Sequence, residues 1–406
     1  MMNPFFLSLF TLRRTLLLLM LCFAQTMLAQ VSSSNAEFPI IACIGVPQHE
    51  ATPERFRELK EAGFNVSLNT YGDNGVAQAI QALDAAEKAG VKLLVKSKLI
   101  NQNDRRFIKS ISTHKALFAY YVSDEPKMAE LNQHRTTVRA LKTMDPKHPA
   151  YVNLFPNLDK SILRHIGVNN YNEYLNAATE MGLDQISFDY YPITDKGLRE
   201  TWFANLESVL AHSKSTGKPF WAYVLSTPHV IYPQPTLSAL RLQVYANLAY
   251  GAQGIQYFTY WTPNPDATYN YHNGPISNDG RRTKTYKVVA EMNAELKQLI
   301  PVFQGAKVQE VHHMVKIPSG TTQLMYAPKG VKQLKVFGNE GAIVSTLKNG
   351  NTTYLAIVNK DYKKSIKVQI HVENNSIVRV NKDLSTEAVK KKPYKLAAGD
   401  LLLFRL

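Results

Sequence analysis

The feature that most constrains the fold is a regular alternation of short β-rich runs with amphipathic helical segments. It extends over residues 38–305 of the 406-residue chain and comprises eight pairs. The segment 52–63 is typical of the helices, because Thr52 can cap the first turn and Gly63 can end the helix. Eight β/α pairs in about 270 residues predict an α/β fold, a (β/α)₈ TIM barrel, since a doubly wound sheet seldom needs so many regular units. The expected strands are 39–46, 64–71, 91–99, 116–123, 149–156, 184–192, 219–226 and 254–261.

The pattern changes after Gly305, where the helical periodicity stops. Short alternating runs such as 352–358 and 365–372 follow, and Asn-Gly, Lys-Gly and Asn-Asn turns separate them. This pattern predicts a small antiparallel β-sandwich of about 100 residues. We therefore expect a barrel domain at residues 30–305 and a C-terminal β-sandwich domain at residues 306–406.

The N-terminal segment 1–29 has the pattern of a secretory signal peptide. Two arginines precede the apolar run 15–24, which is too short to cross a bilayer, and Ala29 offers a small residue for cleavage. Cys22 suggests a lipid anchor, but Leu21 stands where such a signal needs a small residue, so we expect no anchor. We therefore expect a secreted or periplasmic protein without a membrane span.

The net charge of +15 invites a nucleic-acid interpretation, but the charge is unevenly distributed. Residues 307–406 hold 17 Lys and Arg against 7 Asp and Glu, a surplus of 10, and the signal peptide adds 2, which leaves only +3 for the rest. No RNA- or DNA-binding motif accompanies the basic tail. We expect a solvated basic surface and no nucleic-acid partner.

Candidate catalytic residues lie at the ends of the predicted strands, because TIM barrels place their chemistry there. The segment A-Y-Y-V-S-D-E-P, residues 119–126, ends with the adjacent acids Asp124 and Glu125, which should raise the proton affinity of each other. Alternation along the strands then predicts which side chains point into the barrel. The polar and aromatic set expected at the mouth is Asn69, Tyr121, Glu125, Asn153, Asp189 and Tyr191.

Aromatic residues of the last two predicted strands complete the expected pocket, namely Trp221, Tyr223, Tyr260 and Trp261. Aromatic rings with amide and carboxylate groups between them suit a sugar, whose apolar faces stack on rings while its hydroxyls form hydrogen bonds. The alternative interpretation is that several of these rings only fill the core. The pattern predicts a carbohydrate substrate.

The chain resembles the TIM-barrel glycoside hydrolases. Their general acid is a Glu at the end of strand 4, where this chain reads Asp-Glu-Pro at residues 124–126. The segment D-G-R-R-T-K-T-Y, residues 279–286, resembles the start of the last helix in β-galactosidase-like barrels of glycoside hydrolase family 42. The resemblance covers roughly residues 38–305 and implies hydrolysis of glycosidic bonds with Glu125 as general acid.

The chain departs from that pattern at the nucleophile. Retaining members of the superfamily use a second Glu at the end of strand 7, but no glutamate occurs between Glu207 and Glu291. Asp189 on strand 6 could be the second carboxylate, either as nucleophile or as base to a water. Alternatively, Asp124 and Glu125 resemble the Asp-Glu pair of the β-N-acetylhexosaminidases of families 20 and 123. That resemblance implies attack by the substrate's own acetamide, which Asp124 would orient with help from a tyrosine.

Two other classes compete with a glycosidase. A non-catalytic carbohydrate-binding barrel would keep the aromatic residues and lose the acids, whereas this chain keeps Glu125 and Asp189 at converging strand ends. A metal-dependent hydrolase would need histidines at ligand spacing, and no such spacing lies on a predicted barrel strand or helix. We therefore expect an enzyme without metal or cofactor, and the sequence indicates no particular oligomeric state.

Overall fold

The computed structural model describes residues 37–406. The predicted signal peptide, residues 1–29, lies outside the described residues, so secretion stays a prediction. Within residues 37–406, no helix combines the length and the apolar character needed to cross a bilayer.

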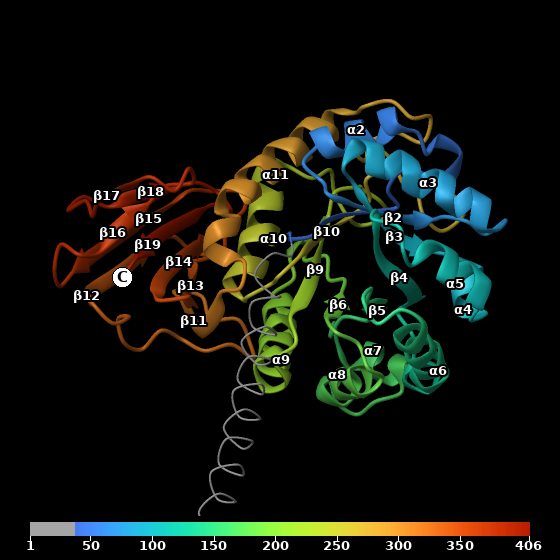
Figure 1. Ribbon diagram of the computed structural model, residues 1–406. Coiled ribbons are helices and arrows are strands. Elements are labelled where there is room, and N and C mark those ends of the chain that lie inside the picture. The colour runs from blue at the N-terminus through green and yellow to red at the C-terminus, as the bar shows by residue number, and fades with distance from the viewer. Residues whose placement is uncertain (1–36) are drawn as a thin grey trace, which may run out of the picture. The chain divides into compact units, whose positions relative to one another are not determined.

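Eight parallel strands close into a barrel in the order in which they occur along the chain (Figure 1). This arrangement confirms the predicted TIM barrel. A two-stranded hairpin, β7 (Ile193–Thr194) with β8 (Gly197–Leu198), lies in the connection that follows the sixth barrel strand. The barrel strands are β1 (Ile40–Cys43), β2 (Val66–Thr70), β3 (Lys92–Lys96), β4 (Leu117–Asp124), β5 (Ala150–Leu154), β6 (Ile186–Phe188), β9 (Phe220–Leu225) and β10 (Ile255–Phe258).

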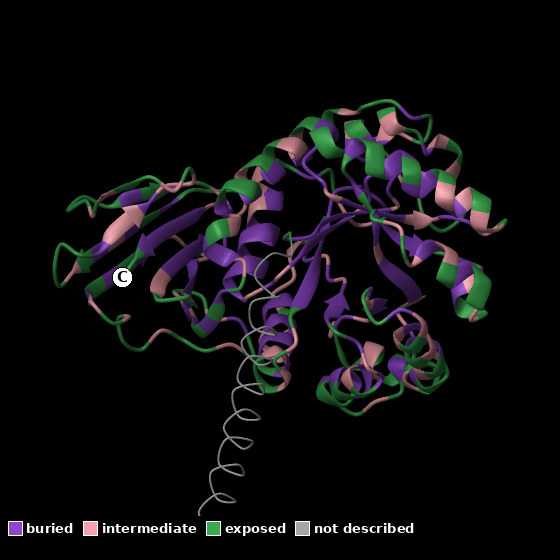
Figure 2. Cartoon of the chain, in the orientation of Figure 1, coloured by how far each residue is buried: buried purple, intermediate pink, exposed green. Residues whose placement is uncertain are grey.

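Helices surround the barrel, most of them with one buried face and α10 buried almost throughout, and the barrel strands are also largely buried (Figure 2). A short 3₁₀ helix, η1 (Gln48–Glu50), follows β1. The α-helices are α2 (Pro53–Glu61), α3 (Val76–Ala89), α4 (Lys98–Asn101), α5 (Arg105–Ile111), α6 (Met128–Met144), α7 (Lys160–Ile166), α8 (Tyr171–Glu180), α9 (Thr201–Thr216), α10 (Leu237–Ala249) and α11 (Lys284–Phe303).

Helix α2 shows how the sequence sets these boundaries. The Thr52 hydroxyl accepts a hydrogen bond from the Arg55 N–H at 3.3 Å, and Pro53 occupies the first helical position, where its missing N–H costs nothing. Gly63, with φ of 92°, turns the chain out of the helix in a left-handed conformation that other residues adopt at a cost. Helix and strand therefore alternate where the sequence predicted.

The C-terminal part is an antiparallel β-sandwich, as the sequence predicted. One sheet has the order β11-β13-β14-β19-β16-β17, and a second has the order β12-β15-β18. Alternate residues such as Leu355, Ile357, Val368 and Phe404 are buried between the sheets. The strands are β11 (Lys307–Met314), β12 (Val331–Phe337), β13 (Ala342–Asn349), β14 (Thr352–Asn359), β15 (Ile366–Val372), β16 (Val378–Val380), β17 (Thr386–Ala388), β18 (Tyr394–Leu396) and β19 (Leu401–Arg405).

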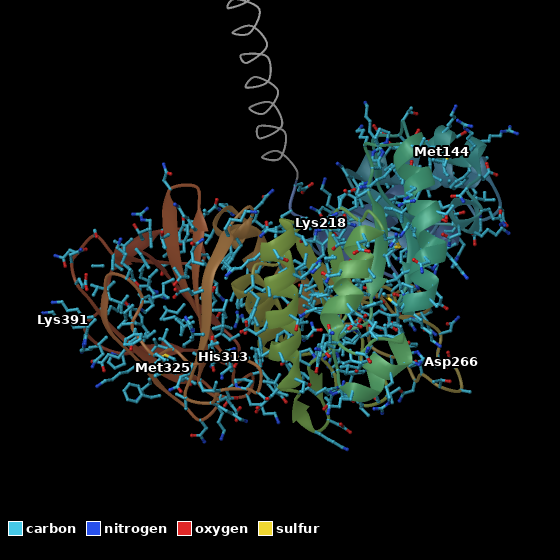
Figure 3. The ribbon with its side chains drawn as sticks, turned by 90° about the horizontal axis from the view of Figure 1, so that it is seen from below. Met144, Lys218, Asp266, His313, Met325 and Lys391 are labelled. Atoms are coloured by element: carbon cyan, nitrogen blue, oxygen red, sulfur yellow. The ribbon has the colours of Figure 1, made fainter. Side chains whose placement is uncertain are left out.

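Hydrogen bonds join the β-sandwich to the last barrel helices. The Ser345 hydroxyl donates to the Ala249 carbonyl at 2.7 Å, and the Asn349 amide donates to carbonyls at the end of α11 at 3.0 and 3.1 Å. His313, at the junction in Figure 3, lies 2.9 Å from the Tyr250 hydroxyl. Because burial lowers the pKa of His313 to about 3, this imidazole is neutral and acts as a hydrogen-bond partner.

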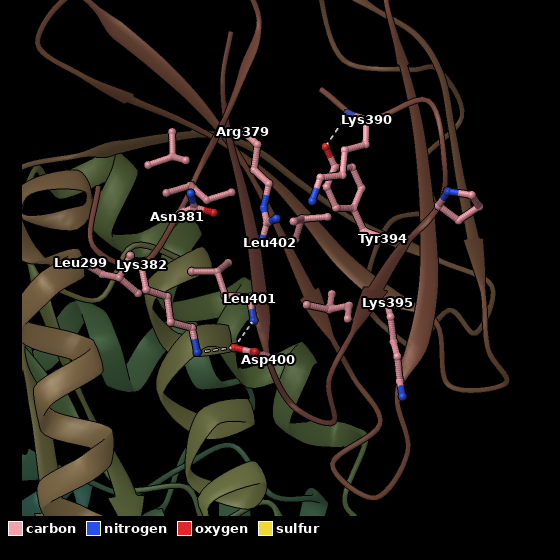
Figure 4. Close-up of a pocket in the computed structure, with 14 residues that line it drawn as sticks. Leu299, Arg379, Asn381, Lys382, Lys390, Tyr394, Lys395, Asp400, Leu401 and Leu402 are labelled. Carbon is pink, nitrogen blue, oxygen red and sulfur yellow. Dashed lines mark hydrogen bonds and ion pairs between the residues drawn. The ribbon is translucent and has the colours of Figure 1, made fainter. Parts of the chain in front are cut away.

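A pocket of about 370 Å³ lies in the β-sandwich next to Leu299 of α11 (Figure 4). Several cations line it, and two of them are in ion pairs: Lys382 lies 2.7 Å from Asp400, and Arg379 lies 2.6 Å from Glu387. None of the predicted catalytic residues lines this pocket. We interpret it as a junction between packed elements, and the candidate chemistry lies at the mouth of the barrel.

Candidate active site

The strand that carries the paired acids contains one extra residue. In β4, Tyr121 pairs with Tyr151 and Asp124 pairs with Asn153, so three steps along β4 match two along β5. This bulge shifts the alternation by one and turns Asp124 toward the side on which Tyr121 and Asn153 point. Simple alternation would have turned Ser123 inward and Asp124 outward.

The backbone of Glu125 completes the change of direction. Its φ is 43°, in the left-handed region that non-glycine residues adopt at a cost of roughly 1–2 kcal/mol, and its N–H donates to the Asn153 carbonyl at 2.8 Å. Two consecutive residues of a regular strand point to opposite faces. The bulge and the left-handed residue together let Asp124 and Glu125 both reach the barrel mouth.

Asn153 links the carboxylates. Its side-chain amide donates to Asp124 at 3.1 Å and to Asp189 at 2.9 Å. Buried side chains deeper in the barrel orient this amide. The Ser187 hydroxyl donates to the amide oxygen at 3.0 Å, and the Gln256 amide donates to the Ser187 hydroxyl at 2.8 Å. The predicted residues Asp124, Glu125, Asn153 and Asp189 therefore lie together, as the strand ends indicated.

Glu125 and Asp189 share a hydrogen bond and compete for a proton. Burial, followed by the negative charge of Asp189, raises the pKa of Glu125 to about 9. Burial and the charge of Asp124 raise the pKa of Asp189 to about 7, while hydrogen bonds from Asn153 and Glu125 hold it lower than burial alone would. Because Glu125 has the higher pKa of the two, it holds the shared proton at neutral pH.

Asp124 is the acid most open to solvent. The residue is exposed on one side, yet the walls of the mouth crowd its carboxyl, and this loss of hydration raises its pKa. Hydrogen bonds from Asn153 and Tyr121 and the positive charge of Lys96 oppose the shift. The Lys96 ammonium also lies 5.1 Å from the centre of the Tyr121 ring. Asp124 is therefore the carboxylate that a polar group of a bound molecule can reach.

Four of the predicted aromatic residues, Tyr121, Tyr191, Trp221 and Tyr223, line the barrel beneath or beside the acids. Tyr121 and Tyr151 lie 5.6 Å apart between ring centres, and Trp221 stacks on Tyr151 at 6.1 Å. Tyr191 contacts Tyr223 edge to face at 6.5 Å. Trp221, Tyr223 and Tyr121 are at most 7% exposed, so in the absence of substrate they form the floor of the mouth, whereas Tyr191 is half-buried.

The prediction that Asn69 points into the barrel is wrong. In β2 the inward side chains are Val66 and Leu68, which belong to the same apolar cluster as the inward residues of β1, β3 and β4. Asn69 instead donates to the Gly45 carbonyl at 3.2 Å, and Ser67 on the same face accepts from the Val46 N–H at 3.1 Å. The polar side chains of this strand satisfy backbone groups of the first βα loop, so polarity was a misleading guide to the pocket.

Tyr260 and Trp261 also lie outside the pocket. Strand β10 ends at Phe258, and Tyr260 is fully buried against Phe64 at 5.4 Å between ring centres. Trp261 packs beneath the Arg55 guanidinium at 5.2 Å. Phe258, which the sequence analysis missed, is the aromatic residue of β10 that contacts Tyr191, at 5.6 Å. Its position as the last residue of β10, in phase with Gln256, is the signal that would have found it.

The acids occupy only one part of the mouth. They lie at the ends of strands β4 and β6, with Asn153 on β5 between them, whereas no inward-facing side chain of β9, β10 or β1 is an Asp or Glu within the described residues. Cys43 of β1 is buried, and burial raises the pKa of its thiol to about 12, so it is no ready nucleophile. The inward residues of this arc are Ile41, Cys43, Trp221, Tyr223, Leu225, Gln256 and Phe258.

Comparisons with known proteins agree with this geometry. The model of the family described as beta-galactosidase, Glyco_hydro_42, matches residues 106–299. The structure of a catalytic mutant of a family 42 β-galactosidase from G. stearothermophilus superposes with a TM-score of 0.65 at 9% identity, covering 91% of this chain and 98% of that one. A family 5 glycoside hydrolase from Bacteroides vulgatus superposes with a TM-score of 0.56 at 12% identity, covering 91% and 89%.

One further match is weaker. The β-galactosidase from the psychrophilic Marinomonas ef1 has a TM-score of 0.47 at 10% identity, and the chain, with 65% of its own length, spans 60% of that protein. No curated protein sequence matches the chain.

The barrel, the acids at its mouth and the family match over residues 106–299 support a TIM-barrel glycoside hydrolase. Within this class, the matched region and the superposed structures make the chain similar to the β-galactosidases of family 42. The match ends before the C-terminal β-sandwich and covers both Asp124 and Glu125.

The raised pKa of Glu125 predicts that the free energy of unfolding falls as pH rises. Because the folded state raises the pKa of Glu125 from its ordinary value of 4.5 to about 9, folding is favoured below pH 4.5 and progressively disfavoured as pH rises toward 9. Glu125→Gln removes this titration, so we expect the variant to melt a few degrees above the wild type at pH 8–9 and much closer to it at pH 5. Thermal unfolding of both proteins between pH 5 and 9 measures the gap.

The matched control is Glu291→Gln, on the exposed face of α11. Its melting temperature should follow that of the wild type at every pH. A constant gap between Glu125→Gln and wild type across this range would contradict the predicted titration.

Proposed function

We propose that the chain is a secreted glycoside hydrolase that cleaves O-glycosidic bonds of an oligosaccharide or polysaccharide, with Glu125 as the general acid. The observation that carries the proposal is the placement of Glu125 beside Asp189 and Asp124 at the barrel mouth, where burial, followed by the negative charge of Asp189, raises its pKa and keeps a proton on Glu125 at neutral pH. A carboxyl that stays protonated at working pH is what departure of a sugar alkoxide requires.

In the proposed reaction, Glu125 gives its proton to the glycosidic oxygen while the bond from that oxygen to the anomeric carbon breaks. The leaving group departs as an alcohol that carries this proton. Water then enters at the anomeric carbon, and the Glu125 carboxylate takes one proton from it, which restores the acid. Acid–base catalysis of this kind contributes about 10²–10⁴-fold to a rate.

The distribution of acids supports attack by the substrate's own 2-acetamido oxygen. Glu125 and Asp189 share a hydrogen bond, which leaves no room between them for an attacking water or an anomeric carbon. The arc formed by β9, β10 and β1 offers no carboxylate across the mouth. A group carried by the substrate would supply the missing nucleophile.

Asp124 would orient that acetamide by accepting a hydrogen bond from its N–H, since Asp124 is the exposed acid of the three. Tyr191 is the better candidate to hold the acetamide carbonyl. The hydroxyl of the alternative, Tyr223, lies 3.1 Å from the Tyr151 hydroxyl in the buried network beneath the acids. Asp189 would then set the proton affinity of Glu125 and shape the pocket.

The second mechanism makes Asp189 the nucleophile or the base to a water. Asp189 lies close enough to Glu125 for both to face one sugar, and carboxyls about 5 Å apart suit a covalent intermediate. The hydrogen bond between the two would have to open when substrate binds. The same reaction class results, so the two mechanisms differ only in the roles of Asp124 and Asp189.

Secretion is proposed from the N-terminal sequence. The apolar run 15–24 after two arginines supports export through a cleaved signal peptide, and Leu21 before Cys22 speaks against a lipid anchor. The substrate would then be an extracellular or periplasmic glycan. Fractionation of expressing cells, with the size of the mature chain measured by mass spectrometry, tests this.

Hydrolysis of 4-nitrophenyl glycosides tests the function. We expect the purified protein to release nitrophenol from at least one glycoside in a panel of β-galactoside, β-glucoside and their 2-acetamido counterparts. The acetamide mechanism predicts that a 2-acetamido glycoside is cleaved at least a hundredfold faster than its 2-hydroxy counterpart. The reverse preference would favour Asp189 as second carboxylate, and glycan binding without any turnover would favour the non-catalytic barrel.

A further inference from the structure

A line of aromatic rings leads from the acids to the protein surface. Phe258 contacts Tyr191 beside the acids and lies 5.7 Å from the ring of His229. His229 lies 4.9 Å from Tyr271, which stacks on Tyr269 at 5.3 Å with 19° between the ring planes. Each of these steps lies within the range of aromatic contacts. We name these five residues, Tyr191, Phe258, His229, Tyr271 and Tyr269, the aromatic track.

Exposure is greatest at the outer end of the aromatic track. Tyr191, Phe258 and Tyr271 are half-buried and His229 between them is 5% exposed, whereas Tyr269 at the outer end is 42% exposed. A set of rings that only formed the core of a loop would bury its last member. Large exposed aromatic side chains that continue a pocket suit a ligand with apolar faces.

The two loops that carry the outer rings are fastened to each other. The Val230 N–H donates to the Asn270 side chain at 2.6 Å, and the His272 N–H donates to the Pro228 carbonyl at 3.3 Å. Within the second loop, Asp266 accepts hydrogen bonds from two backbone N–H groups, including that of Tyr269 at 2.8 Å. Tyr269 is therefore held in place before any ligand binds, which lowers the entropy cost of binding on it.

We infer that the aromatic track binds further sugar units of a glycan chain whose cleaved bond lies at Glu125. The inference rests on the proposed function and deepens it: the substrate is an oligosaccharide of at least three units, and short glycosides fill only the inner end. Pyranose faces would stack on Tyr271 and Tyr269, and the same loop exposes polar side chains, such as Asn270 and His272, that can form hydrogen bonds with hydroxyl groups.

Binding of oligosaccharides to the Glu125→Gln variant tests the inference without turnover. The probes are β-1,4-linked N-acetylglucosamine and β-1,4-linked galactose oligomers of one to six units, titrated by calorimetry. We expect the affinity for one series to rise at least tenfold between two and five units. Tyr269→Ala in the same background should abolish most of this rise, while Tyr269→Phe, which keeps the ring, should preserve it.

Tyr326→Ala is the matched control, because Tyr326 is 87% exposed and lies in the β-sandwich. Its neighbour Met325 and the track loop residue Asp266 are well separated in Figure 3. This control should leave both affinity and chain-length dependence unchanged. Melting temperatures within about a degree of the parent would show that Tyr269→Ala acts on binding and not on folding.

The inference is overturned if neither series binds, if affinity does not rise beyond two units, or if Tyr269→Ala keeps the full rise. Failure of the proposed function is a separate result, because it is read from the wild-type protein on nitrophenyl glycosides. Length-dependent binding without any hydrolysis would contradict the proposed enzyme activity and support glycan binding by the aromatic track. Hydrolysis of nitrophenyl glycosides without length-dependent binding would contradict glycan binding by the aromatic track and support the proposed enzyme activity.

Discussion

Glu125→Gln is expected to lower kcat by about 10²–10⁴-fold on glycosides with poor leaving groups. The amide can still donate a hydrogen bond to Asp189, so the mouth should keep its shape, but it has no proton to give to the glycosidic oxygen. Steady-state kinetics on alkyl or oligosaccharide substrates measure the loss. A dinitrophenyl glycoside, whose leaving group needs little protonation, should lose far less activity.

The pH profile gives a second reading of the same variant. Wild-type kcat/KM should fall on the alkaline side as Glu125 loses its proton, well above the usual carboxyl range, because its pKa is raised to about 9. Glu125→Gln should lack this limb, and the control Glu291→Gln should retain both the limb and full activity. Near-normal turnover of an oligosaccharide by a folded Glu125→Gln protein would refute the acid assignment.

The sequence predicted the barrel and the convergence of the acids for physical reasons. Parallel strands of a barrel end at one rim, so Glu125, Asn153 and Asp189 were expected to meet whatever the loops do. The sequence did not reveal how Asp124 and Glu125, as neighbours, could both reach that rim. The answer depends on a bulge and a left-handed backbone, and neither leaves a glycine or proline signal at those positions.

The errors share a cause. Asn69 was assigned to the pocket because it is polar, but its amide satisfies a backbone carbonyl outside the barrel. Tyr260 and Trp261 were assigned because the strand was taken to continue past Phe258, where it ends. Alternation predicts the face of a side chain only when the strand boundary is known, and boundaries depend on hydrogen bonds between strands that sequence patterns do not contain.

Two conservative substitutions separate the two proposed mechanisms. If the substrate's acetamide attacks, Asp124→Asn should lower kcat at least a hundredfold, because a neutral amide no longer stabilises the developing positive charge on the cyclising acetamide. Asp189→Asn should cost much less. If Asp189 is the second carboxylate, the two effects on kcat exchange. Asp124→Asn should then lower kcat only as far as a less rigid loop around Glu125 does.

The proton affinity of Glu125 allows the two roles of Asp189 to be distinguished within one experiment. The charge of Asp189 is the second-largest influence that raises the pKa of Glu125 after burial, so Asp189→Asn should move the alkaline limb to lower pH under either mechanism. Asp189→Asn with a shifted limb but substantial maximal rate would mean that Asp189 tunes the acid. Complete loss of turnover at every pH would mean that Asp189 takes part in bond formation.

A thiazoline mimic of the cyclised acetamide intermediate completes the comparison, because a site built for that intermediate binds its mimic far more tightly than the substrate. We expect competitive inhibition of the wild type and a loss of affinity of at least tenfold in Asp124→Asn, since Asp124 would hold the ring nitrogen of the mimic. Asp189→Asn should bind it nearly as well as the wild type. Equal and weak inhibition of all three proteins would exclude the acetamide mechanism and leave Asp189 as the only acid at the mouth that can act together with Glu125.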